Sequence, residues 1–219
     1  MKNVDDLVES AATLAAEGRS KGEIADELNV SRETARWLVE HAGTDDATAA
    51  SDTADGPEDV HVDWSAIGRD STRLHHVGAA LADLLSKQGT DVDLTIGVEK
   101  AGGPLATTVA RELDTDLGTY TPAKHQWDDG NGTSAPADRP TDAGGTFSRN
   151  FAEIRGRECY VVDDTITSGT TMTETIAAVR DAGGEPVACG ALVDKRGVDA
   201  IADVPIYSLI GVVRVEGEP

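Results

Sequence analysis

Two adjacent carboxylates and a run of hydroxylated residues follow a short apolar segment in the last third of the chain. Cys159 to Val162 is apolar, β-branched or aromatic, which predicts a buried strand. Asp163 and Asp164 end this strand, and residues 165–171 (TITSGTT) are predicted to form a loop, in which Gly169 permits a tight turn. Hydroxyls and backbone N–H groups at a helix start bind anions, whereas paired carboxylates suit a vicinal diol. Together they predict a site for a ribose 5-phosphate; an ordinary capped strand–turn–helix is the alternative.

A second segment of this kind lies earlier in the chain. Leu94 to Val98 (LTIGV) is strand-like, residues 99–103 (EKAGG) follow it, and Leu105, Val109 and Leu113 are spaced for one face of a helix. Paired glycines let a backbone approach an anion closely, although many strand–helix turns carry them. In a parallel sheet, loops that follow strands meet at one edge, where ligands bind. We therefore expect the two segments to form one site.

The first segment resembles the phosphoribosyl-pyrophosphate (PRPP) loop of the type I phosphoribosyltransferases, and the second resembles their pyrophosphate loop. Residues 187–194, the turn 195–197 and residues 205–210 are similar to the closing strands of the orotate branch. The resemblance implies an α/β fold, with a parallel sheet flanked by helices. It also implies that the acid pair holds ribose hydroxyls or a Mg²⁺-bound sugar, with no other cofactor. The implied ligand-binding residues are Glu99, Lys100, Ala101, Gly102, Gly103, Asp163, Asp164, Thr165, Thr167, Ser168, Gly169, Thr170 and Thr171.

The segment between the two loops departs from the pattern of that branch. Orotate phosphoribosyltransferases carry there a lysine-rich loop over the pyrophosphate leaving group. Residues 126–145 hold instead Asp128, Asp129, Asp138 and Asp142 against Arg139. Because cations stabilise the charge that develops on a phosphate, we expect a catalytically silent domain with no catalytic residues. A working orotate or purine phosphoribosyltransferase with a fused regulatory domain is the alternative.

The first 42 residues have the pattern of a helix-turn-helix. Ser20 and Glu23 form a capping box, and residues 29–31 (NVS) predict a turn before a third helix, Arg32 to Glu40. Such a helix enters the major groove of DNA, so we call it the recognition helix. A three-helix docking module is the alternative. The expected DNA-binding residues are Ser31, Arg32, Glu33, Thr34 and Arg36.

Charge lowers the attraction of DNA for this chain. Residues 1–41 contain five Lys and Arg against nine Asp and Glu, a net of −4, and the whole chain carries −21. This acidity is typical of proteins that work in molar salt, where the Debye length falls to about 3 Å and repulsion becomes short-ranged. Counterion release also weakens with salt, so base contacts and dimer avidity would have to supply the affinity.

Length and composition predict two domains that are connected by an acidic linker. We expect a DNA-binding domain over residues 1–42, a flexible acidic linker over 43–60 and a phosphoribosyltransferase-like effector domain over 61–219. The absence of a long apolar run and of a signal peptide predicts a cytoplasmic protein. Cys159 and Cys189 fall in predicted core strands, which favours buried free thiols. No metal-ligand spacing is present among the histidines.

The combination resembles a family of haloarchaeal transcriptional regulators of glucose and fructose catabolism. It implies a DNA-binding regulator of sugar catabolism genes, in which the old PRPP site senses a phosphorylated sugar or PRPP-like effector. Paired half-sites make a homodimer the expected assembly, and no membrane partner is expected. A nucleotide-responsive scaffold that does not touch DNA is a third interpretation.

Overall fold

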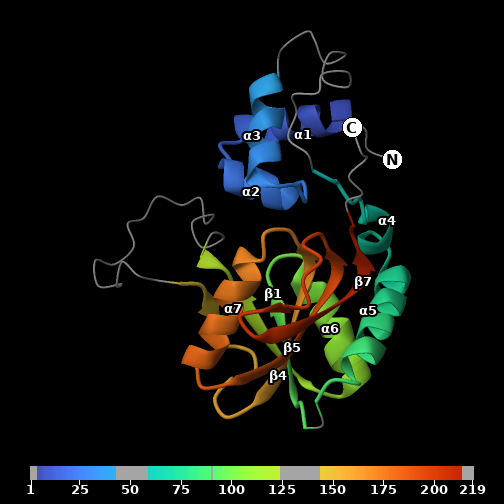
Figure 1. Cartoon of the computed structure of the whole chain (residues 1–219), viewed down its shortest axis with the longest axis vertical. Coiled ribbons are helices and arrows are strands. Elements are labelled where there is room, and N and C mark those ends of the chain that lie inside the picture. Colours follow the sequence, from blue (N-terminus) through green and yellow to red (C-terminus); the bar gives the residue numbers. More distant parts are fainter. Residues whose placement is uncertain (1–3, 43–58, 90, 124–143, 214–219) are drawn as a thin grey trace, which may run out of the picture. The chain divides into compact units, whose positions relative to one another are not determined.

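The structure is a computed structural model that describes residues 4–42, 59–89, 91–123 and 144–213 (Figure 1). The chain forms two compact units, Met1–Ala66 and Ile67–Pro219. Of the predicted linker, residues 43–60, only Asp59 and Val60 belong to the described part. The boundaries predicted for this linker therefore stay predictions.

The described part of the first unit contains three helices around one small core. Its apolar side chains come from all three helices and from the turn between the second and third. The helices are α1 (Val4–Ala16), α2 (Lys21–Glu27) and α3 (Arg32–His41), and the buried residues are Leu7, Val8, Ala11, Ile24, Ala25, Leu28, Val30, Ala35 and Leu38.

Local signals in the sequence set the limits of these helices. The Ser20 hydroxyl accepts from the Glu23 N–H at 3.3 Å, and the Glu23 carboxylate accepts from the Ser20 N–H at 2.6 Å, which confirms the capping box. Asn29 adopts a φ of 53°, the left-handed conformation that the turn requires. Ser31 then caps α3 through the Thr34 N–H at 3.0 Å. The predicted capping box, the turn and the helix that follows it are therefore present.

The second unit is a mixed sheet with helices on both faces (Figure 1). Its described elements begin within the short helix that spans the boundary between the units. They are α4 (Ser65–Gly68), α5 (Ser71–Leu85), β1 (Leu94–Val98), α6 (Gly102–Leu113), β2 (Asp116–Thr121), β3 (Thr146–Phe147), β4 (Glu158–Ile166), α7 (Thr170–Asp181), β5 (Glu185–Asp194), β6 (Ala200–Ile201) and β7 (Val204–Gly211).

The strand order of the sheet is β3-β2-β1-β4-β5-β7-β6. Strands β2, β1, β4, β5 and β7 pair in parallel, and the two short edge strands pair antiparallel with their neighbours. From β1 the chain moves outward to β2 through α6, whereas from β4 it moves the other way to β5 through α7. The strand order therefore reverses between the parallel strands β1 and β4. Ligands of α/β sheets bind at such a switch point.

The helices that follow β1 and β4 cover opposite faces of the sheet (Figure 1). Met172, Ile176 and Val179 of α7 pack on one face, in a core that also contains Leu94 and Ile96 of β1. Helix α6 packs with α5 on the other face. Gly97 of β1 permits the close approach of α6 to the sheet, because a Cβ there would lie 2.8 Å from the Ala106 Cβ and 3.0 Å from the Gly103 Cα.

Strand β4 is longer than the sequence pattern predicts. The apolar run ends at Val162, yet pairing with β5 continues to Ile166, which lies opposite Asp194. The acid pair and Thr165 therefore belong to the strand, and Thr170 and Thr171 belong to α7. Only residues 167–169 form the connecting loop. The prediction of a loop over 165–171 was wrong because backbone pairing with a neighbouring strand stabilises a hydroxyl-rich segment as a strand.

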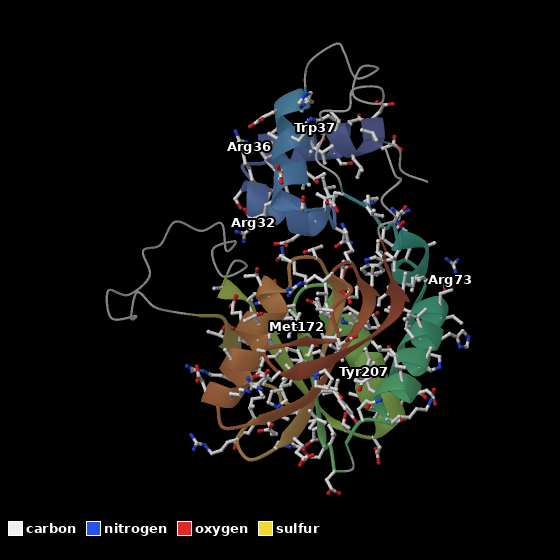
Figure 2. The ribbon with its side chains drawn as sticks, viewed as in Figure 1. Arg32, Arg36, Trp37, Arg73, Met172 and Tyr207 are labelled. Atoms are coloured by element: carbon white, nitrogen blue, oxygen red, sulfur yellow. The ribbon has the colours of Figure 1, made fainter. Side chains whose placement is uncertain are left out.

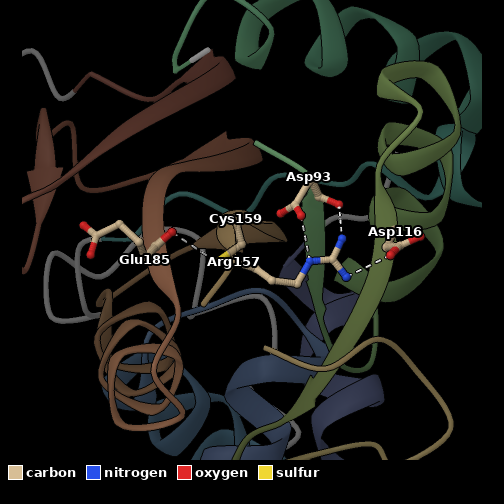
Figure 3. Close-up of polar contacts among 5 residues, drawn as sticks. All are labelled: Asp93, Asp116, Arg157, Cys159 and Glu185. Atoms are coloured by element: carbon tan, nitrogen blue, oxygen red, sulfur yellow. Dashed lines mark hydrogen bonds and ion pairs between the residues drawn. The ribbon is translucent and has the colours of Figure 1, made fainter. Parts of the chain in front are cut away.

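The end of the sheet opposite the switch point is held by Arg157 (Figure 3). Its Nε donates to the Asp93 Oδ2 at 3.0 Å and its Nη1 to the Asp116 Oδ2 at 2.8 Å, while Nη2 donates to the Asp93 carbonyl at 2.8 Å. One guanidinium therefore ties the segment before β4 to the starts of β1 and β2. Buried Cys159 lies beside it and is free, as is buried Cys189; burial raises the pKa of Cys159 to about 12.

We expect Arg157→Lys to lower the free energy of unfolding by about 1–2 kcal/mol, because an ammonium cannot reproduce the three directed bonds of the guanidinium. Solvent keeps the effect moderate, since the side chains of Asp93 and Asp116 are 55% and 66% exposed. Denaturant titration at constant KCl measures it. Arg155→Lys is the matched control, because Arg155 is exposed on the same connection. An equal loss in both variants would contradict this account.

No helix among the described residues is both long enough and apolar enough to cross a membrane.

Candidate functional site

The two predicted anion-binding segments meet at the switch point. A Cβ added to Gly102 would lie 2.7 Å from the Val162 carbonyl oxygen and 2.9 Å from the Asp163 Cα. These distances are too short for any side chain, so the start of α6 lies directly against the acid pair of β4. The sequence placed these segments far apart, and the fold brings them together.

The two carboxylates of the pair differ in burial. Asp163 is 9% exposed, and its Oδ1 accepts from the Asp164 N–H at 2.8 Å. Asp164 is half-buried and accepts from the Thr165 hydroxyl at 3.1 Å. Two adjacent acids at a strand end repel each other, and a ligand rich in hydroxyls or a cation would offset that repulsion.

The helices that start at the switch point differ from the others in their caps. α2, α3 and α5 each begin with a side-chain cap, from Ser20, Ser31 and Asp70. α6 begins after Ala101 and α7 after Gly169, and neither of these N-cap residues has a side chain that can bond to the helix start. Exposed N–H groups at a helix start, with the positive end of the helix dipole, favour an anion. The starts of α6 and α7 are therefore the candidate positions for phosphate groups at the switch point.

Hydroxyl groups surround the start of α7. The Ser168 hydroxyl accepts from the Thr170 N–H at 3.3 Å and lies 3.0 Å from the Thr170 hydroxyl. Ser168 and Thr170 are exposed, and Thr167 and Thr171 are half-buried. Gly169 has a φ of 75° and turns the chain into the helix. The predicted phosphate-binding residues therefore lie together, with hydroxyls accessible to a ligand.

The segment before α6 is held by β2. The Glu99 N–H donates to the Tyr120 carbonyl at 2.8 Å, and the Glu99 carboxylate accepts from the Thr121 hydroxyl at 2.7 Å. Lys100 is exposed, and the Glu99–Lys100 peptide is cis. Glu99 thus positions this loop through β2, and Lys100 stays a predicted ligand of a second anionic group.

Arg196 is a site residue that the sequence reasoning missed. A Cβ on Gly169 would lie 2.4 Å from the Arg196 Nη1 and 3.2 Å from its Cδ, so the guanidinium lies over the loop before α7. The Arg196 N–H donates to the Asp194 Oδ1 at 2.8 Å, which fixes the turn after β5. Arginine binds phosphate with directed hydrogen bonds. The Lys-Arg-Gly turn was noticed in the sequence, but its place beside residues 167–169 depends on β4–β5 pairing.

Glu174 is a second missed residue, one turn into α7. Its Oε1 accepts from the Tyr120 hydroxyl at 2.9 Å, the Ala123 N–H at 2.8 Å and the Gly145 N–H at 3.0 Å. Burial, and then the bond to Glu174, raise the pKa of Tyr120. One carboxylate thereby joins α7 to both described ends of the connection between β2 and β3. Residues 124–143, which include the acidic residues of that connection, lie outside the described residues.

The five predicted DNA-binding residues fall into two groups on α3. Arg32, Glu33 and Arg36 are exposed, and Figure 2 shows the two arginines on this helix. Ser31 and Thr34 are half-buried and bond to each other at the helix start. The Arg36 Nε donates to the Glu40 Oε1 at 2.8 Å, which raises the pKa of Arg36. The outer face of α3 therefore offers two arginines to a partner, one of them paired with a carboxylate.

Comparison with known proteins identifies both the fold and the family. Residues 63–203 match the family model for the phosphoribosyl transferase domain. Adenine phosphoribosyltransferase from Thermoanaerobacter pseudethanolicus has the same fold, with a TM-score of 0.54 at 18% identity over 74% of this chain and 92% of that one. Transcriptional regulator GfcR of Haloarcula marismortui is 67% identical over 98% of this chain and 97% of its own length. That of Halorubrum lacusprofundi is 66% identical over the full length of both. The chain belongs to the GfcR family of transcriptional regulators.

Proposed function

We propose that this protein is a dimeric, sequence-specific DNA-binding regulator of central sugar catabolism genes. Its phosphoribosyltransferase-like unit is the sensor: it binds a phosphorylated sugar or PRPP-like ligand at the switch point and does not transfer the phosphoribosyl group. The observation that carries the proposal is the occurrence, in one chain of the GfcR family, of three helices with exposed arginines on the third and of a switch point where the acid pair meets the start of α6.

The geometry of the first unit supports the DNA-binding part. Four residues, 28–31, separate α2 from α3, which is the spacing of a helix-turn-helix. Arg32 and Arg36 are one turn apart on the exposed side of α3, where a guanidinium can form two bonds to guanine. The exposed positions of α3 carry charged side chains and not the apolar cluster of an obligate protein interface.

The chemistry of the second unit supports the sensor part. The two helix starts, the hydroxyls of residues 167–171 and the guanidinium of Arg196 favour a phosphate beside α7. The carboxylates of Asp163 and Asp164 favour the hydroxyls of a sugar. Carboxylate oxygens are also ligands that Mg²⁺ prefers, so the pair fits a metal ion that arrives with a pyrophosphate group.

Arg32→Ala and Arg36→Ala should each weaken binding to a selected operator by about 1–3 kcal/mol and relax the base preference at one position of each half-site. The half-sites should lie about one helical turn apart. Selection from random duplexes in molar KCl, followed by anisotropy titration of full-length variants, measures both effects.

Arg19→Ala is the matched control, because it removes the same charge near the start of α2, where Arg19 pairs with Glu23 at 3.5 Å. We expect it to weaken binding slightly and without a change in base preference. If Arg32→Ala and Arg36→Ala both keep full affinity, α3 is not the recognition helix. Footprinting upstream of sugar-kinase and glycolytic genes, with and without phosphorylated sugars, then identifies targets and effector.

A working phosphoribosyltransferase is the second candidate function, because the acid pair and the loop before α7 are both present. It requires cations over the leaving group, and residues 126–145 contain four Asp against one Arg. A measurement of phosphoribosyl transfer therefore decides between the two candidate functions.

A further inference from the structure

Asp59 places its carboxylate at the start of the recognition helix. Its Oδ2 accepts from the Ser31 N–H at 2.5 Å and from the Thr34 hydroxyl at 3.0 Å. Its Oδ1 accepts from the Val60 N–H at 2.8 Å. Asp59 is 28 positions beyond Ser31, so this is a tertiary contact and not part of the local helix cap.

The donors that Asp59 occupies belong to the end of α3 that a helix-turn-helix presents to DNA. The first residues of a recognition helix contact base edges and the backbone beside them, and N–H groups and hydroxyls at a helix start are common phosphate donors. The sequence predicts that both Ser31 and Thr34 contact DNA. A carboxylate on these donors excludes a phosphate from them and repels the next phosphates of the strand.

A second contact holds the same segment to the turn before α3. With the amide of Asn29 oriented to satisfy both its neighbours, its oxygen accepts from the Trp64 indole N–H at 3.1 Å. Residues 59–64 are therefore fastened to the helix-turn-helix at two points. Along the chain, this segment leads through α4 to Asp70, the cap of α5. Asp59 thus belongs to the stretch of sequence that joins the DNA-binding unit to the phosphoribosyltransferase-like unit.

We propose that Asp59 is an internal competitor for DNA: its carboxylate occupies the Ser31 and Thr34 donors in the free protein and leaves when a DNA phosphate takes them. The inference rests on the proposed function, since it assumes that α3 binds DNA. It adds a regulatory contact, because any movement of residues 59–64 changes how often these donors are free. A purely structural role, in which Asp59 only stabilises the start of α3, gives the opposite result on substitution.

The test compares full-length wild type with Asp59→Asn and Asp59→Ala on a selected operator in molar KCl. If the contact is occupied about nine-tenths of the time, its removal should tighten binding about tenfold. Glu17→Gln is the matched control, since it removes the same charge at an exposed position beyond α1. It should change affinity less than about twofold. Asn still offers a neutral oxygen to both donors, which is a weaker acceptor than a carboxylate, so it should tighten binding less than Ala and keeps the fold if the Ala variant does not.

Operators with one neutral methylphosphonate at a time provide the second measurement. At the phosphate that replaces Asp59, neutralisation should abolish the advantage of the Asp59 variants, and elsewhere the advantage should remain. Equal or weaker binding by Asp59→Asn, with a wild type that binds its operator, overturns the competitor and leaves the proposed function intact. Binding only by the Asp59 variants supports both. If no form binds any duplex, the proposed function fails and the competitor fails with it.

Discussion

Purified protein supplied with PRPP, Mg²⁺ and a nucleobase should give no phosphoribosyl transfer in molar KCl. The reason is the charge of residues 126–145, where Asp128, Asp129, Asp138 and Asp142 outnumber Arg139. Loss of a single preorganised donor to a developing oxyanion typically lowers kcat by about 10²–10³-fold. A whole set of missing cations should reduce transfer below detection, even though the ligand still binds.

Orotate, uracil, adenine, guanine, hypoxanthine and xanthine are the bases to assay, with release of pyrophosphate as a common readout. An orotate phosphoribosyltransferase adapted to the same KCl concentration is the control, because it separates absent catalysis from inhibition by salt. Turnover of about 1 s⁻¹ or more on any one base lies within the ordinary enzyme range. That result would make the protein an enzyme and overturn the sensor-only proposal.

Elements whose limits depend on local signals could be predicted from the sequence. The strand at Leu94–Val98 and the capping box of α2 occur as predicted, and α3 differs from its predicted range only by His41. These features depend on hydrophobic periodicity and on side chains that bond within a few residues. The resemblance of two loop segments to those of the type I phosphoribosyltransferases predicted the fold, and the family model confirms a phosphoribosyltransferase domain.

Contacts between distant segments could not be predicted in the same way. Glu174 bonds to Tyr120 across 54 positions, and Asp59 bonds to Ser31 across 28. The sequence shows an acid on a helix in the first case and an acidic linker in the second, and most such acids are solvated. The place of Arg196 over Gly169 likewise depends on β-strand pairing that sets the two connections side by side. Arg196 and Glu174 therefore complete the candidate ligand site, and Asp59 adds the proposed regulatory contact, only once the fold is known.

The double substitution Asp163→Asn with Asp164→Asn should abolish the response of DNA binding to a phosphorylated sugar ligand. The acid pair is the part of the site where a ligand has the clearest role, because two adjacent like charges at a strand end repel each other and hydroxyls or a cation would offset that repulsion. Asn has the shape of Asp, and its oxygen can still accept the Asp164 or Thr165 bonds of the native arrangement. The fold and the affinity for operator without ligand should therefore survive.

The size of the lost response follows from linkage. A ligand shifts an equilibrium only if it binds the DNA-competent and incompetent states with different affinity. Typical coupling free energies of about 1–3 kcal/mol correspond to changes of about 5–150-fold in operator affinity. Wild type should show a change of this order when ribose 5-phosphate, PRPP with Mg²⁺ or a hexose phosphate is titrated in, and the double variant should show none.

The matched control is Asp83→Asn with Asp114→Asn, which removes two charges at exposed positions of the same unit. Its ligand response should equal that of wild type. Arg196→Ala tests the phosphate side of the site without altering the acid pair, and it should shift the response to higher ligand concentration while keeping its amplitude. A double Asn variant that responds with full amplitude would place the effector site elsewhere. The acid pair would then be a retained feature of the phosphoribosyltransferase fold, and Asp59 would need another signal to release the recognition helix.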